Sequence, residues 1–468
     1  MLPVQLTRLL DGDPAGLGEA LDLVTGLDEA LVHGLGRLAE ERAAALTALA
    51  DAFALTPLGE GLAEATAKII TGSVTEESLT TLAGGRAALL GAVHDALLAD
   101  LDAALGRERD PWQAAPVPGT DSGNLLGAAR SWLCELAITG WRGVDHGLVS
   151  TADQVIEALL AVPGHRRPAV LLDGLAAELR ASCPVGTMER LPVRRWADLW
   201  TRALLLAGEG DRTGESAPPG HQPGLSGRLL ILGVDVHEHS TAVQAQVHGV
   251  LEPSGGGQAR LVRATVAATK VDTIVGPAVW RLLHRHPLLL GALAGRHSLD
   301  ITDMPVLAGG DLVWDDSRAR AGEPAAPFAV ARLRLAGALA SAVPPLDRHP
   351  VRVSEPVLVE DYKVTADGSF DLGTAVLTVD TDLLPACGPL TPKLVAGSSA
   401  CIGLVRWDDG RWLLQPLAVQ TRGRRETLDA HTGDWALGPT DPKVVKAEAR
   451  TGDAVAILRE RAGRLLRR

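Results

Sequence analysis

The residues best suited to chemistry form an alternating run in the second half of the chain. Asp235, His237 and His239 occupy every second position of the segment VDVHEH. If residues 231–239 form a strand, these three side chains point to the same face, because side chains alternate along a strand. A carboxylate and two imidazoles on one face are suitable ligands for zinc or a similar divalent ion. The segment is therefore a candidate metal site.

The same segment also has a simpler interpretation, which stays open. Alternation of apolar and polar residues is typical of any half-buried antiparallel strand. In that case Val234 and Val236 lie in the core and the polar side chains face water. If a metal is bound, His248 and His297 are the candidates to complete its ligand set.

Other short motifs of enzymes are absent or lie in the wrong context. Ser399 lies at the centre of Gly-Ser-Ser-Ala-Cys, which resembles the nucleophile elbow G-x-S-x-G, but the last position is Cys401 and no strand–turn–helix pattern surrounds it. Residues 34–39 match the loose dinucleotide-binding pattern without the preceding strand that it needs. The sequence has no P-loop, H-E-x-x-H or C-x-x-C motif. It therefore predicts no catalytic residue and no cofactor.

Charge is distributed unevenly along the chain. Of the formal net charge of −12, about −11 lies in residues 1–207, and the remainder is close to neutral. An acidic half repels nucleic-acid phosphates, and the other half contains no basic stripe. Nucleic-acid binding is therefore not expected.

The sequence is typical of a cytoplasmic protein. Its longest apolar run, at 287–294, is much shorter than the roughly 20 residues of a membrane helix, so no membrane partner is expected. Residues 1–14 lack the features of a signal peptide. The four cysteines show no paired spacing, which fits a reducing compartment.

The sequence pattern changes at residues 208–227, which are rich in Gly, Pro, Ser and charge and predict a flexible linker. Helical periodicity dominates before this stretch and strand alternation after it. We therefore expect an α+β multidomain fold, in which an all-α region precedes a mostly antiparallel β-rich module. The predicted parts are a helical unit at 1–109, a second helical unit at 125–207, the linker at 208–227, the β-rich module at 228–440 with a helical insertion at about 277–293, and an amphipathic C-terminal helix at 441–468.

Two helices are predicted most clearly. Residues 85–105 place leucines on one face at helical spacing. A helix starting near Val193 places Trp196 and Trp200 on one apolar stripe, which predicts that both indoles lie in the core.

The best-defined hairpin surrounds Asp409-Gly410. A type I′ turn needs positive φ at two successive residues, and Asp-Gly adopts it readily. With a two-residue turn, Trp407 lies opposite Trp412, and such aromatic cross-strand pairs stabilise a sheet by roughly 0.2–1 kcal/mol.

Two further hairpins are predicted. Residues 242–251 and 260–271 flank a glycine-rich loop. A second Asp-Gly pair, at 367–368, predicts another type I′ turn between strands at 357–364 and 370–379.

The segment LPVRRWADLW at 191–200, together with GLDEA at 26–30, resembles uncharacterised bacterial accessory proteins. Their genes lie near those of SWIM zinc-finger proteins, MoxR-type AAA+ ATPases and von Willebrand factor A proteins. This chain has neither the SWIM ligand pattern nor the ATPase loops. The resemblance implies an accessory role and transfers no catalytic residue.

These observations favour a cytoplasmic, non-enzymatic accessory or scaffold protein that acts through protein–protein contacts. The resemblance suggests an AAA+ ATPase system as its partner. The alternative is a metal-binding protein or an enzyme that uses the β-rich module, with Asp235, His237 and His239 at its centre.

Overall fold

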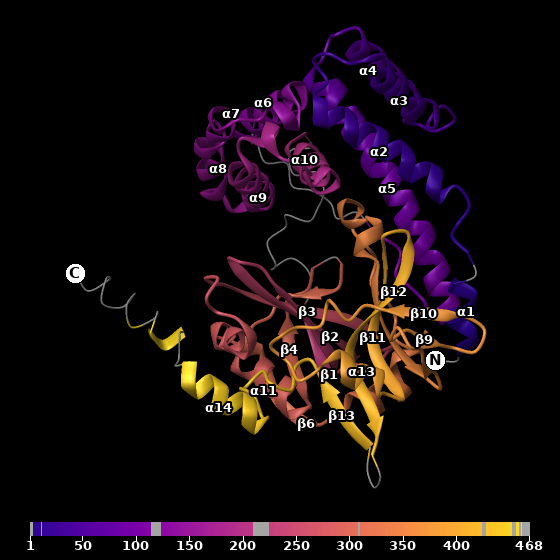
Figure 1. Ribbon diagram of the computed structural model, residues 1–468, viewed down its shortest axis with the longest axis vertical. Helices are drawn as coiled ribbons and strands as arrows, with labels where there is room; N and C mark the ends of the chain where they lie inside the picture. The colour runs from indigo at the N-terminus through magenta and orange to yellow at the C-terminus, as the bar shows by residue number, and fades with distance from the viewer. Residues whose placement is uncertain are drawn as a thin grey trace.

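The computed structural model describes residues 3–10, 12–113, 123–208, 224–307, 309–423, 427–451, 455–457 and 460. The α+β class expected from the sequence is confirmed, because a helical region precedes two mostly antiparallel sheets and a short C-terminal helix (Figure 1). Among the helices of these residues, none combines the length and the apolar character that a membrane span requires.

The helical region has one shared core. Trp196 and Trp200 are fully buried in it, which confirms the predicted tryptophan stripe, and Trp141 lies in the same core. Both predicted helical units, 1–109 and 125–207, contribute leucines to this core, so the two units pack together. The helices are α1 (Pro3–Leu10), α2 (Leu17–His33), α3 (Glu40–Asp51), α4 (Gly59–Ile70), α5 (Glu76–Leu105), α6 (Gly123–Thr139), α7 (His146–Ser150), α8 (Asp153–Leu160), α9 (Arg166–Ser182) and α10 (Val193–Gly208).

Helix α5 belongs to two cores. It begins well before the predicted residue 85, after an N-cap in which Thr75 Oγ1 accepts a hydrogen bond from the backbone N–H of Ser78. Its first half contributes Leu82 to the helical core. Its second half contributes Leu97 and Leu101 to a different core, which also contains α1 and residues of the second sheet. A helix of 30 residues is about 45 Å long, and α5 runs from the helical region down to the sheets (Figure 1).

The β-rich module contains two sheets. The first has the order β5-β3-β2-β1-β4-β6 and the second β7-β11-β12-β10-β9-β8, with β13 also paired to β12. All pairs are antiparallel except β3–β5 and β10–β12. The strands are β1 (Leu225–Glu238), β2 (Ala242–Pro253), β3 (Arg260–Thr269), β4 (His297–Met304), β5 (Asp311–Leu312), β6 (Ala319–Pro324), β7 (Ser354–Glu360), β8 (Lys363–Val364), β9 (Phe370–Asp371), β10 (Val376–Val379), β11 (Ala400–Asp408), β12 (Arg411–Arg422) and β13 (Thr427–His431).

The two sheets face each other across a shared apolar layer. Leu232 of β1 and Val250 of β2 lie in one cluster with Ile402 of β11 and Ala418 of β12. Gly233 allows a close approach, because a Cβ atom there would lie 2.8 Å from the side chain of Leu417. The shared layer therefore buries the face of each sheet that is turned toward the other sheet.

Helices cover the outer faces of both sheets. The predicted helical insertion is confirmed as the 3-10 helix η4 (Gly276–Leu283) and helix α11 (Pro287–Gly295), which pack on the first sheet through Trp280 and Leu289. Helix α1 and the second half of α5 pack on the second sheet. The helical and β-rich parts are therefore joined by packed side chains as well as by the chain itself.

Ion pairs reinforce this junction. Arg107, just after α5, has its Nη1 2.8 Å from Glu355 Oε2 of β7. Arg348 Nη1 lies 2.9 Å from Asp95 Oδ2 of α5. Both arginines thus connect α5 to the chain that leads into the second sheet.

The hairpin at Asp409-Gly410 is confirmed. Trp407 pairs with Trp412, and the turn residues have φ of 50° and 72°, as a type I′ turn requires. The hairpin of β2 and β3 is also confirmed.

The hairpin predicted at residues 367–368 is confirmed only as a short one, in which β8 pairs antiparallel with β9, and the predicted turn type is wrong. The backbone N–H of Gly368 donates to Thr365 O, so the central turn residues are Ala366 and Asp367, and only Gly368 has positive φ. β8 and β9 are two residues each. β7 pairs instead with β11, and β10 pairs in parallel with β12. Long-range pairing with the central strands thus replaces most of the local hairpin.

Regular elements occupy both ends of the predicted linker at 208–227. α10 ends at Gly208 and β1 begins at Leu225, and residues 209–223 lie outside the described residues. The expected C-terminal helix is observed at its start as α14 (Pro442–Thr451), whose Val444 packs against the core of the first sheet. Val455 is buried in the core of the first sheet, whereas 461–468 lie outside the described residues.

Candidate functional sites

Strand β1 brings Asp235 and His237 together. His237 Nε2 lies 2.8 Å from Asp235 Oδ2, and the imidazole is about half exposed. The Asp235 side chain is only 4% exposed. Val234 and Val236 lie in the core on the opposite face, as expected. The solvated-face interpretation is therefore wrong at Asp235, because the second sheet covers this face of β1.

His239 is not part of this pair. β1 ends at Glu238, and His239 lies in the exposed turn that follows, with its Nδ1 3.1 Å from Thr241 Oγ1. In the described part of the chain, no three His, Cys, Asp or Glu side chains lie close enough together to hold a metal ion. The metal site at Asp235, His237 and His239 stays a prediction, and Asp235 and His237 are the two members that the fold places in contact.

The second sheet supplies the other partners of Asp235. Gln415 Nε2 of β12 donates to Asp235 Oδ1 at 2.7 Å. Arg406 Nη1 of β11 donates to Gln415 Oε1 at 2.6 Å. Burial raises the pKa of Asp235, but the hydrogen bonds from His237 and Gln415 and the charge of His237 act together against burial and hold the pKa below its usual value. Asp235 is therefore ionised at neutral pH.

His248 lies beside this network on β2. It is 2% exposed, and its Nε2 has no hydrogen-bond partner among the described residues. Burial, followed by the charge of Arg263, lowers the pKa of His248 to about 4. The imidazole is therefore neutral at pH 7.

The arrangement can orient a proton acceptor. A carboxylate that accepts from Nε2–H fixes the tautomer of His237 and leaves Nδ1 as the basic nitrogen. This geometry suits a general base or a metal ligand. No hydroxyl or thiol of the described residues hydrogen-bonds to His237, so the pair lacks the nucleophile of a catalytic triad in this part of the chain.

Other nucleophile candidates are unreactive or already bonded. Burial raises the pKa of the Cys134 thiol to about 11 and that of Cys387 to about 12, so neither is a thiolate at neutral pH. Ser399 Oγ donates to the backbone carbonyl of Gln420 at 3.3 Å.

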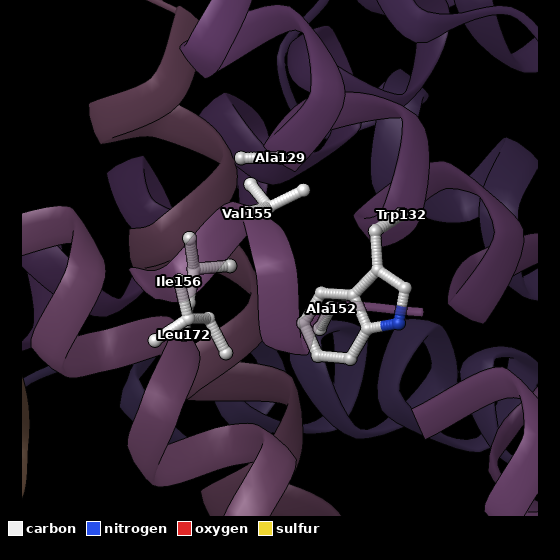
Figure 2. Close-up of a pocket in the computed structure, with 6 residues that line it drawn as sticks. All are labelled: Ala129, Trp132, Ala152, Val155, Ile156 and Leu172. Atoms are coloured by element: carbon white, nitrogen blue, oxygen red, sulfur yellow. The ribbon is translucent and has the colours of Figure 1, made fainter. Parts of the chain in front are cut away.

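Figure 2 shows an apolar cavity between α6, α8 and α9. Trp132, Ile156, Leu172 and three smaller side chains line it, and it has no room for a water molecule. The indole N–H of Trp132 donates to the carbonyl of Leu148. No ligand site follows from this packing defect.

A second hollow, on the surface of the β-rich module, is polar and larger, with a volume of about 210 Å³. It lies where β7 and β12 end and β11 and β13 begin. Its lining residues are Arg332, Glu360, Asp361, Ser399, Ala400, Gln420, Arg422 and Thr427. We refer to it as the polar hollow.

The turn between α3 and α4 exposes an unusual run of apolar side chains. Leu55 is 102% exposed and Leu58 is 43% exposed. No charged residue occurs between Asp51 and Glu60. These helices lie at the end of the helical region farthest from the sheets (Figure 1). We call this surface the apolar tip, and its exposed members are Ala52, Ala54, Leu55, Pro57 and Leu58.

Sequence reasoning missed both the partners of Asp235 and the apolar tip. Gln415 interrupts the apolar run WLLQPLAV, and this interruption was the available signal for a buried polar contact. For the tip, the signal was the uncharged segment AFALTPLG between two amphipathic helices.

Comparison with known proteins adds no relative. No protein-family model, curated protein or solved structure matches the chain significantly. The α+β class and the sites described above are therefore the basis for a functional proposal.

Proposed function

We propose that this chain is an accessory protein that acts through protein–protein contacts and that the apolar tip is its recognition surface. The observation that supports this most is the complete exposure of Leu55. Single exposed leucines are common on protein surfaces. Leu55 differs from such cases because it lies on an uncharged run at the end of a helical hairpin.

The tip is held in one conformation by its own turn. Phe53 is buried in the helical core and anchors the turn from within. Thr56 N–H and Thr56 Oγ1 both donate to Phe53 O, at 2.8 Å each. At Gly59 a Cβ atom would lie 2.5 Å from the same carbonyl, so the turn closes only with glycine there. A rigid apolar anchor loses little entropy on binding, which favours recognition.

The charge around the tip indicates the kind of partner. Asp51 and Glu60 flank it and are exposed, and Glu64 follows one turn later. Lys68 of the same helix is paired with Glu64. The proposed partner is therefore a protein with an apolar pocket whose rim carries Lys or Arg. The sequence resemblance makes an AAA+ ATPase system the first partner to assay.

The experiment is a mild purification of tagged protein from its host, with identification of the proteins that co-purify. Leu55→Ser should weaken binding of the specific partner by about tenfold or more, as expected for a central anchor residue. Leu437→Ser is the matched control, because Leu437 is 69% exposed on the β-rich module. Binding should also weaken with salt. Equal recovery of the partner with Leu55→Ser and with the parent protein would contradict the proposal.

The second candidate function is a metal-binding protein or an enzyme centred on the β-rich module. The contact between His237 Nε2 and Asp235 Oδ2 favours it. The protein should then contain near-stoichiometric divalent metal, measured by elemental analysis, and His237→Ala should remove it. Metal-free parent protein that does not respond to added zinc in thermal unfolding would contradict this function.

A further inference from the structure

The polar hollow contains one ion pair that fixes its shape. Arg332 donates from Nε and Nη2 to a single oxygen, Glu360 Oε1, at 3.0 and 2.9 Å. Arg332 Nη2 also donates to Gln420 Oε1 at 2.8 Å, and its guanidinium lies 5.7 Å from the ring centre of Phe328. The amide of Gln420 is oriented in turn by Asp429 Oδ1 at 2.9 Å. These contacts fix the positions of Arg332 and Gln420, which form one wall of the hollow.

Two other charged side chains of the hollow, Asp361 and Arg422, have no ion-pair partner in the described residues, and one oxygen of Glu360 is also left without a donor. Glu360 Oε2 accepts no hydrogen bond there, and neither Asp361 nor Arg422 makes an ion pair. Asp361 has φ of 57°, a left-handed conformation that is uncommon for residues other than glycine and often occurs at ligand sites. Asp361 follows the last residue of β7 and lines the hollow.

From this arrangement we propose that the polar hollow binds a small zwitterion of the α-amino acid class. Its carboxylate would pair with Arg422, and its ammonium group would bind between Glu360 Oε2 and Asp361. Arg422 and Asp361, a cation and an anion that make no ion pair among the described residues, match the two charges of such a ligand. The volume of about 210 Å³ is below the roughly 300–1,000 Å³ of sites for drug-sized ligands, which fits a small molecule. This inference is independent of the apolar tip.

Isothermal titration calorimetry of the full chain against each of the twenty amino acids tests the proposal. At least one amino acid should bind. Its amide, which lacks the carboxylate, and its N-acetyl form, which lacks the ammonium group, should both bind about tenfold or more weakly. Arg422→Gln and Asp361→Asn should each weaken binding by a similar factor. Arg411→Gln is the control, because Arg411 is exposed in the Asp409-Gly410 hairpin and does not line the hollow.

Three results would overturn the proposal. The first is that no amino acid binds at millimolar concentration. The second is that the N-acetyl form binds as tightly as the free amino acid, which would indicate a simple anion site. The third is that both Arg422→Gln and Asp361→Asn bind like the parent protein, which would place the ligand elsewhere. Thermal unfolding of each variant shows whether the variant is folded, so a loss of binding can be assigned to the hollow.

Discussion

Lowering the pH from 7 to 5 should destabilise the fold, because a buried histidine remains neutral in the folded state. Burial is the main cause that lowers the pKa of His248 to about 4. In the unfolded chain the pKa of histidine is about 6.5. Between these two values the unfolded state binds the proton and the folded state does not, so stability falls as the pH falls through this window. His431, which is 4% exposed with a pKa also lowered to about 4, acts in the same direction.

The size of the effect follows from the two pKa values. At pH 5 the unfolded imidazole is almost fully protonated and the folded one is about one-tenth protonated, which corresponds to about 2 kcal/mol for His248. Asp235 affects the stability of the fold in a lower pH range than His248. Its pKa is lowered in the folded state, so its contribution is present above about pH 4 and is lost only below it.

Urea unfolding at pH 7 and pH 5 measures this effect. In His248→Gln, the difference in unfolding free energy between the two pH values should be smaller than in the parent by about 2 kcal/mol. His239→Gln should leave the difference unchanged, because His239 is exposed. The comparison of pH differences holds even if His248→Gln is less stable at both pH values. The reasoning is refuted if His248→Gln keeps the full pH dependence of the parent.

Three further changes test the packing and the polar network. Leu97→Ala should lower the unfolding free energy by about 2–5 kcal/mol, measured in urea, and a loss below about 1 kcal/mol would contradict the role of α5 in the core of the second sheet. Gly410→Val should lower stability by about 1–3 kcal/mol, because a β-branched residue is strained at φ of 72°, and a variant as stable as the parent would contradict the turn assignment. Gln415→Leu removes a donor from Asp235 and should raise its pKa, so acid unfolding should begin at higher pH, and an unchanged acid midpoint would count against the network.

Local structure was predictable where turn chemistry decides it. The dipeptide Asp409-Gly410 determines both its turn type and the pairing of Trp407 with Trp412. At 367–368 the same dipeptide predicted the wrong turn type and too long a hairpin, because only β8 and β9 pair there while β7 and β10 pair with distant central strands. Pairing between distant segments depends on tertiary packing, and one local sequence does not contain that information.

The α+β class was predictable from the sequence, but the way in which α5 connects the helical region to the second sheet was not. Composition identified the change from helical to strand patterning at 208–227, and the predicted order of a helical region followed by a β-rich module was correct. It did not reveal that α5 carries Leu82 in one core and Leu97 in another. A single amphipathic stripe has the same periodicity whichever neighbour it packs against.

The arrangement of the candidate metal residues was likewise predictable only in part. Alternation correctly placed Asp235 and His237 on one face of β1, and the sequence did not show that the second sheet covers this face. The second sheet, which is distant in sequence, packs on this polar face of β1. Asp235 there becomes part of a hydrogen-bonded network with Gln415 and Arg406.

The central claim is that the apolar tip contacts a protein partner, and photocrosslinking from position 55 tests it most directly. A photoreactive phenylalanine analogue in place of Leu55, introduced into the full chain in its host, should form one dominant adduct that weakens when Asp51 and Glu60 are both changed to Lys. The same analogue at Leu437 should not form this adduct. No adduct from position 55, or the same adduct from both positions, would contradict the claim.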